Sequence, residues 1–283
     1  MKDDLRAGAG FAVLAAAAFA ATAACVKAAS AAAPNEVVVF FRSAVSLLVL
    51  APWMLRHGLD AVRTTRPVGH LVRAGFGVCA MYSFFYAIAH LHLSEAMLLT
   101  YSTPLYLPFL AWAWLKEPPP PVVLLAVGLG LVGIVLIARP GAGGLLDTAG
   151  LVGAISGLCA ACAMVTIRSI SATEPAPRIV FHFAALSTAI SAVPLLWAWR
   201  TPSPHTLALL VATGLLATLG QLSLTRAYAL APAARIGAFA YSSVIFAGVL
   251  GWLLWGERPD ARSLAGMALV IGCCLLAGWR PRA

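Results

Sequence analysis

Long apolar runs, separated by short charged or proline-rich segments, cover almost the whole chain. An α-helix rises 1.5 Å per residue, so about 20 apolar residues cross a hydrocarbon layer of about 30 Å. The pattern predicts an all-α polytopic membrane protein with ten transmembrane helices. These predicted spans are 7–29, 36–55, 69–90, 94–114, 121–138, 149–169, 178–199, 206–229, 234–255 and 262–279.

Composition supports membrane burial of these runs. The 283 residues are 61% hydrophobic and 10% charged, with a mean hydropathy of +0.92, whereas a soluble domain is roughly 25% charged. The net charge of +9 would suit a nucleic-acid partner, but the charges lie between apolar runs. We therefore expect the lipid bilayer, and no nucleic acid, as the partner. The first run is long enough to be a retained span rather than a cleaved signal.

The positions of lysine and arginine predict the orientation. Cytoplasmic loops are enriched in these residues. With the N-terminus inside, thirteen of the 19 fall on the inner side, Arg73 among them, and four on the outer side. The remaining two, Lys27 and Arg42, lie within spans. The chain is predicted to be a multi-pass protein of the inner (plasma) membrane with both termini in the cytoplasm.

The chain also repeats itself at an offset of 140 residues. Tyr101-Ser102 aligns with Tyr241-Ser242, and Trp112-to-Glu117 aligns with Trp252-to-Glu257. Each half then holds five spans, residues 1–140 and 146–283. Because five is odd, the second half enters the membrane inverted, and such repeats can open a midplane site to either side in turn.

This organisation resembles the EamA-type branch of the drug/metabolite transporter superfamily. The resemblance rests on the two five-span halves and on the turns Lys116-Glu117-Pro118 and Gly256-Glu257-Arg258-Pro259. It implies a carrier for small metabolites, similar to bacterial amino-acid exporters, and it covers nearly the whole chain. Lys116 stands where the family usually has glycine, which puts the geometry of that turn in question.

Polar side chains gather in the third, fourth, eighth and ninth spans, which hold all six tyrosines. Polar groups in lipid are costly, so these faces are expected to line a substrate cavity. The alternatives are aromatic packing with interhelical hydrogen bonds and a membrane-interface belt. The candidate substrate-binding residues are Tyr82, Tyr86, Tyr101, Ser102, Gln221, Thr225, Tyr228, Tyr241 and Ser242.

Two further features suggest chemistry inside the membrane. Pro104 and Pro108 are predicted to kink the fourth span near its middle, because proline removes a helix hydrogen bond. Lys27 and Arg42 could bind a substrate carboxylate or guard the outer mouth, or they could snorkel to the interface. Arg42 lies deeper and is the stronger candidate.

No motif for an enzyme, a cofactor or a metal stands out. Cys159-x-x-Cys162 lies in an apolar run without histidine, so we predict packing rather than a metal site. The hypothesis is a transporter, monomeric in its simplest form, that exports small metabolites such as aromatic and other amino acids. A carrier for a purine, a flavin or a cationic toxin stays open, as does an intramembrane enzyme acting on lipid-like substrates.

Overall fold

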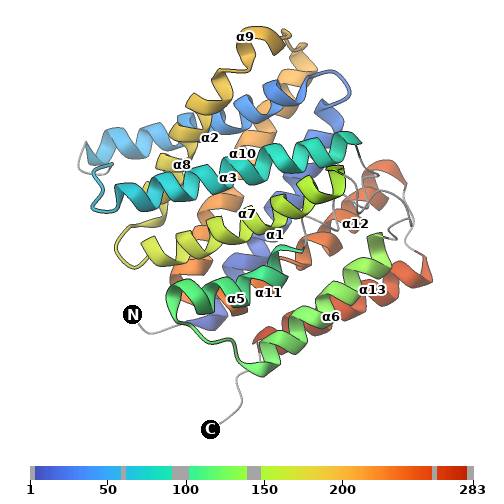
Figure 1. Cartoon of the computed structure of the whole chain (residues 1–283). Coiled ribbons are helices and arrows are strands. Elements are labelled where there is room, and N and C mark those ends of the chain that lie inside the picture. The colour runs from blue at the N-terminus through green and yellow to red at the C-terminus, as the bar shows by residue number, and fades with distance from the viewer. Residues whose placement is uncertain (1–3, 59–61, 91–101, 139–147, 257–259, 279–283) are drawn as a thin grey trace.

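Helices form every regular element in the part of the chain that the structure describes. The computed structural model describes residues 4–58, 62–90, 102–138, 148–256 and 260–278 (Figure 1). The helices are α1 (Leu5–Ala29), α2 (Asn35–His57), α3 (Pro67–His90), α5 (Thr103–Leu115), α6 (Pro121–Ala138), α7 (Thr148–Ile170), α8 (Ala176–Ala192), α9 (Leu195–Ala198), α10 (Pro204–Leu230), α11 (Ala233–Phe239), α12 (Ser242–Trp255) and α13 (Ala261–Gly278).

Several of these helices match a membrane in length and polarity. Among the described residues, five segments are long and apolar enough to cross a bilayer, and two further apolar helices are shorter. The prediction of an all-helical, membrane-type fold is confirmed, while the count of ten spans stays a prediction. The five long segments are Leu5–Ala29, Asn35–His57, Gly150–Ile170, Pro204–Leu230 and Ala233–Leu254.

The helix contacts follow the order that the predicted repeat requires. The first five spans correspond to α1, α2, α3, α5 and α6, and the second five to α7, α8–α9, α10, α11–α12 and α13. Helix α3 packs along α7, and the equivalent pair, α10 and α1, packs in the same way. Helices α6 and α13 pair with each other, as do α2 and α8 (Figure 1). Two halves related by a pseudo-two-fold axis would produce this pairing.

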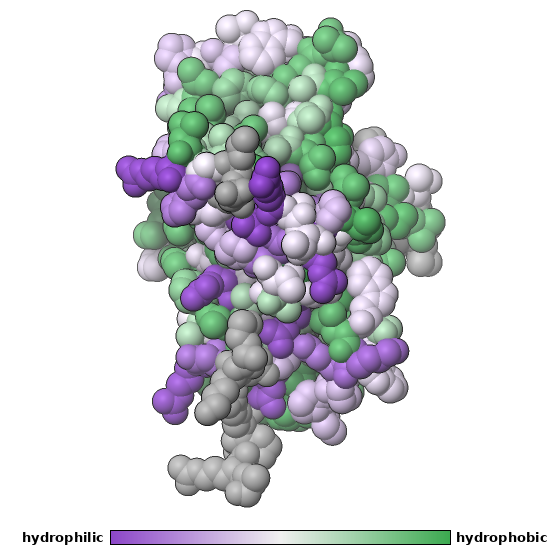
Figure 2. Space-filling model, turned by 90° about the vertical axis from the view of Figure 1, so that its left-hand side faces the viewer, coloured by the Kyte–Doolittle hydropathy of each residue, from purple (hydrophilic) through white to green (hydrophobic). Residues whose placement is uncertain are grey.

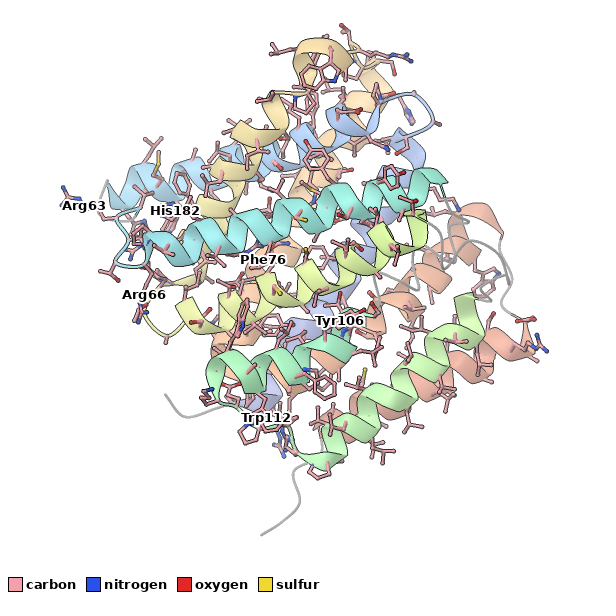
Figure 3. The ribbon with its side chains drawn as sticks, viewed as in Figure 1. Arg63, Arg66, Phe76, Tyr106, Trp112 and His182 are labelled. Atoms are coloured by element: carbon pink, nitrogen blue, oxygen red, sulfur yellow. The ribbon has the colours of Figure 1, made fainter. Side chains whose placement is uncertain are left out.

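One end of the bundle carries many of the hydrophilic side chains. Figure 2 looks onto the end where α3 begins and α2 and α7 end; hydrophilic residues gather in its middle and lower part, between hydrophobic edges. Arg63 and Arg66 project from this end in Figure 3. It is the end that the lysine and arginine count predicts to face the cytoplasm.

The fourth predicted span requires a correction. Helix α5 begins at Thr103, so Pro104 lies in its first turn and cannot kink the middle of a helix. At that position the missing N–H costs nothing, because first-turn amides have no partner within the helix. Pro108 does lie inside α5. Residues 91–101, Tyr101 included, lie outside the described part of the chain.

Two predicted single helices are broken. The seventh run divides at Val193 and Pro194 into α8 and α9. The ninth divides between α11 and α12, at Ala240 and Tyr241, where the sequence has no proline. There Ser242 Oγ donates to the Phe239 carbonyl at 2.7 Å, and Ser243 Oγ donates to the Ala240 carbonyl at 2.7 Å. These hydroxyls satisfy carbonyls at the break, which lipid could not do.

The two family turns share a backbone conformation although their residues differ. Lys116 ends α5 with φ 57° and ψ 28°, and Gly256 ends α12 with φ 70° and ψ 16°. Each donates its backbone N–H to carbonyls in the last turn of its helix. Lysine therefore keeps the left-handed cap that glycine makes in the second half.

Lys116→Gly is expected to stabilise the protein by about 1 kcal/mol. Lysine adopts positive φ at a cost that glycine does not have. The melting temperature of the purified protein in detergent checks this, with Lys116→Ala as the matched variant. Alanine should give no gain, and an equal gain from alanine would mean that the side-chain charge, not the backbone, limits stability.

Candidate functional site

A small cavity, lined by both polar and apolar side chains, lies between α2, α8 and α10. It has room for about one water molecule, so a metabolite can enter only if these helices move apart. Two of the three helices belong to the second half of the chain and one to the first. The lining residues are Arg42, Ser43, Ser46, Val180, Phe183, Ala184, Ser187 and Gln221.

Arg73 of α3 lies beside this cavity and is 4% exposed. Its Nη2 donates to Gln221 Oε1 at 2.8 Å, and its guanidinium carbon lies 3.6 Å from the centre of the Phe183 ring. The Nε and Nη1 atoms are buried and have no hydrogen-bond partner. The charge thus has one amide oxygen and one aromatic face as its contacts, and two donors remain unused.

The side chain of Arg73 points into the bundle, away from the nearer end of α3. It is the seventh residue of the helix, and side chains lean toward the N-terminus, where this arginine could snorkel. Its Nη1 instead lies where a Cβ on Gly77 would be, one turn further in. A Cβ there would also lie 2.8 Å from Phe183 Cε2. The absence of a side chain at Gly77 therefore makes room for the guanidinium.

A second arginine approaches the same place from α2. Arg42 is half-buried two turns into the helix, lines the cavity, and its Nη1 lies 3.3 Å from Met81 Sδ. Arg42 is close enough to Arg73 for the two charges to repel. Among the described residues, no carboxylate pairs with either of them. That Arg42 binds a substrate carboxylate or guards the outer mouth stays a prediction.

Hydroxyl groups with unused hydrogen-bonding capacity surround the arginines. Ser43 Oγ and Tyr82 Oη are buried and have no partner among the described residues. Tyr82 packs against the cluster of Ala74, Val78 and Phe183. Ser43 lines the cavity itself. Donors and acceptors from α2, α3 and α10 thus surround a space that the protein does not fill with its own polar groups.

The predicted site residues within the described chain separate into three groups. Gln221 and Arg42 line the cavity, and Tyr82 lies beside it. The expectation that the third, fourth, eighth and ninth spans bound the substrate cavity stays a prediction. The small cavity in this structure is lined mostly by α2 and α8, the second and seventh spans. The third and eighth spans, α3 and α10, do contribute through Arg73 and Gln221.

Five other candidates lie in packing contacts or at helix ends, in α10, at the break between α11 and α12, and at the start of α5. Thr225 and Tyr228 are buried in α10, where Tyr228 Oη donates to Met164 Sδ at 3.1 Å. The Tyr241 ring packs against Gly130 of α6, and Ser242 caps the end of α11. Ser102 is the N-cap residue of α5. None of these five residues lines the cavity.

Two candidates lie at the surface of the bundle. Tyr86 is 40% exposed near the end of α3, and Lys27 is exposed in the last turn of α1. Lipid or the membrane interface surrounds such positions, which suits the snorkelling that the sequence left open for Lys27.

A pair of histidines lies between the cavity and the hydrophilic end. The His70 and His182 rings are 4.3 Å apart, and His182 Nε2 lies 2.9 Å from the Val62 carbonyl oxygen. Figure 3 places His182 at the same end as Arg63 and Arg66. His70 is 3% exposed. This pair joins the loop before α3 to α8.

A buried carboxylate holds the same loop. Glu174 accepts hydrogen bonds from Thr64 Oγ1 at 2.7 Å and the Thr65 amide at 3.1 Å, and pairs with Arg178 at 2.8 Å. Burial raises the pKa of this carboxyl, but the hydrogen bonds and the arginine outweigh burial and hold the pKa below its usual value. Glu174 therefore stays charged and bound to its own partners, not to Arg73.

The cysteines show no metal-binding arrangement in the described part of the chain. Cys159 Sγ lies 3.5 Å from Cys79 Sγ, across the contact of α7 with α3. No group of three histidine, cysteine or acidic side chains that could hold an ion is found among the described residues.

Two residues of the site went unrecognised in the sequence. Arg73 lies close to a predicted span end and was counted as a cytoplasmic charge. Phe183 is one aromatic residue within an apolar run, and no pattern distinguishes it from core. The i,i+4 pair of Arg73 and Gly77 was the available signal, since a small residue one turn further in leaves space for a long side chain.

A helical bundle of this hydropathy, with two arginines at a small cavity between helices of both halves, is typical of a polytopic membrane protein with a polar internal site. The comparisons assign the family. The EamA-like transporter family matches residues 6–139 and again 148–279, and the chain belongs to this family. The prediction of a transporter of this family, not an enzyme, is confirmed.

Similar proteins carry different substrates. The chain is 35% identical to the pseudopaline exporter CntI of Pseudomonas aeruginosa over 276 residues, 96% of each protein. It is 27% identical to a riboflavin transporter of Rhizobium johnstonii over 245 residues, 86% of this chain and 81% of that one. A crystal structure that shares 19% identity has the same fold, with a TM-score of 0.80 over 95% of this chain and 96% of the other.

Proposed function

We propose that this protein exports small metabolites across the inner membrane, with amino acids and their derivatives as the substrate class. The observation that carries the proposal is the polar cavity at Arg42 and Gln221, enclosed by helices of both halves. Buried donors that have no partner in the described chain favour a binding site, because a ligand would satisfy them. The similarity to a pseudopaline exporter supports export.

Transport would follow alternating access in this proposal. Ten spans form two inverted halves, residues 1–140 and 146–283, with both termini in the cytoplasm. The paired contacts of α3 with α7 and of α10 with α1 support such a relation. Rocking one half against the other would open the cavity to each side in turn. A monomer contains the complete cavity, so no second copy is needed for binding.

Flux through proteoliposomes tests the proposal. Purified protein is reconstituted and offered labelled phenylalanine, glutamate, succinate, riboflavin, adenine and S-adenosylmethionine, with protein-free liposomes as the blank. We expect saturable flux of at least one carboxylate-bearing amino acid or acid. Efflux from preloaded cells that express the protein, compared with cells that do not, tests the direction.

Gln221→Ala should lower that flux by about tenfold with no loss of protein yield, because it removes the amide that holds the Arg73 guanidinium. Tenfold corresponds to about 1.4 kcal/mol, which is the scale of a charge-assisted hydrogen bond. Tyr106→Ala, at a half-buried position of α5 away from the cavity, should have little effect. Equal losses in both variants would indicate general packing and count against the cavity.

A further inference from the structure

Two arginines lie at the cavity, and no carboxylate among the described residues pairs with either of them. Arg73 is 4% exposed, Arg42 lies close to it, and no acidic side chain lines the cavity or pairs with either arginine in the described chain. Buried charges without a counter-ion are costly, and a cost of this kind persists where function requires it. Glu174, a buried carboxylate, is bound to Arg178 and to the loop before α3.

The guanidinium of Arg73 is also held in place. The Phe183 ring lies against its face at 3.6 Å, and Gln221 accepts from Nη2 at 2.8 Å. Its Nε and Nη1 atoms are left without partners. A stacked guanidinium offers its remaining donors in one plane, which is the geometry that a carboxylate accepts.

We propose that the transported metabolite carries a net negative charge, and that one of its carboxylates binds between Arg42 and Arg73. Gln221 and Phe183 orient Arg73 for this contact. This inference rests on the proposed function, because it names the substrate class of that same cavity. The carboxylate supplies the counter-charge that the helices lack. It also accepts from a donor of Arg73 that the described chain leaves unused and reaches the hydroxyl of Ser43 at the cavity wall.

The charge balance separates this class from the other candidates. A zwitterionic amino acid would bring an ammonium group for which the cavity has no acidic partner, so its charge would meet two arginines. A cation such as S-adenosylmethionine would be repelled by both. A neutral flavin or purine would leave the two charges uncompensated. A dicarboxylic acid, or an amino acid with an acidic side chain, keeps a net negative charge and satisfies the site.

Gln221→Glu tests the charge balance without knowledge of the substrate. It places a carboxylate of nearly the same shape next to Arg73 Nη2, where it acts as an internal counter-ion. We expect the melting temperature in detergent to rise by about 3 °C or more, while flux of anionic substrates falls at least tenfold. Gln221→Leu, the matched variant, removes the hydrogen bond but adds no charge, and should lower the melting temperature. A melting temperature that falls with glutamate would overturn the proposal.

Substrate selectivity supplies the second test. With succinate, glutamate, glutamine and lysine as probes, wild-type flux should favour succinate and glutamate over glutamine by at least tenfold, and lysine should not be carried. Arg73→Gln should remove this preference. Arg226→Gln deletes a charge from an exposed position on the same helix as Gln221 and should leave the preference unchanged.

The two tests separate failure of the inference from failure of the proposed function. Flux of neutral or cationic compounds with no preference for anions would overturn the inference and keep the transporter. No flux of any probe in either direction, with Gln221→Glu still stabilising, would contradict the metabolite class of the proposed function but retain the anion site.

Discussion

Replacing Gly133 with valine is expected to prevent α6 from packing on α13 and to leave little folded protein. A Cβ at this position would lie 2.7 Å from the Gly266 carbonyl oxygen and 3.0 Å from Val270 Cγ2. The first of these atoms is backbone and cannot rotate away. Overpacking costs about 1–3 kcal/mol where side chains can adjust, so the loss here should exceed 3 kcal/mol, against a total stability of only about 5–15 kcal/mol. Size-exclusion chromatography in detergent measures the folded fraction.

The same helix provides the control for this variant. Gly128 lies a turn and a half before Gly133, and a Cβ there would meet nothing within 4 Å. Gly128→Val should therefore leave the elution profile and the melting temperature close to wild type. If both variants were lost equally, the defect would lie in the helix itself or its insertion, and the close contact of α6 with α13 would not be the cause.

The helices themselves were predictable from the sequence because one physical requirement determines them. A segment in lipid must satisfy its own backbone groups, so an apolar run of sufficient length forms a helix. The helix α10, Pro204–Leu230, extends two residues before the predicted run and one beyond it. The same principle does not locate helix breaks, since the division between α11 and α12 depends on serine hydroxyls that are equally compatible with a continuous helix.

The site was less predictable because its geometry depends on contacts distant in sequence. Arg73 contacts Gln221, 148 positions away in the chain. Its side chain can point inward only because Gly77 has no side chain to occupy the place of the guanidinium. The sequence pointed to Gln221 through a shared polar face, and to Arg42 through its depth in a span. It counted Arg73, near the start of the predicted span 69–90, as a cytoplasmic charge, because hydropathy alone does not distinguish a snorkelling arginine from a buried one.

The turn after α5, one of the two on which the family resemblance rests, has a structural role that the contacts of Glu117 show. Glu117 Oε1 accepts from Arg168 Nε at 3.1 Å, and Oε2 accepts from the Ala233 amide at the start of α11 at 3.3 Å. Arg168 Nη1 in turn donates to the Tyr228 carbonyl at 3.1 Å. One carboxylate and one arginine thus connect the ends of α5, α7 and α10 with the beginning of α11.

We expect Arg168→Ala to destabilise the protein by about 2–3 kcal/mol and Glu117→Ala by somewhat less. Removing Arg168 leaves both the Glu117 carboxylate and the Tyr228 carbonyl, in the last turn of α10, without this donor. Removing Glu117 leaves the Ala233 amide, at the start of α11, without its acceptor. The two side chains are 15% and 27% exposed, so water replaces part of the lost contact and keeps both values below those of a fully buried pair.

Thermal unfolding of both single variants and the double variant measures the coupling. The double variant should cost about 1–2 kcal/mol less than the two single losses together, and Arg226→Ala on the exposed face of α10 should cost nothing. Strict additivity would mean that Glu117 and Arg168 act on separate helix ends, and that the turn does not join the two halves of the chain.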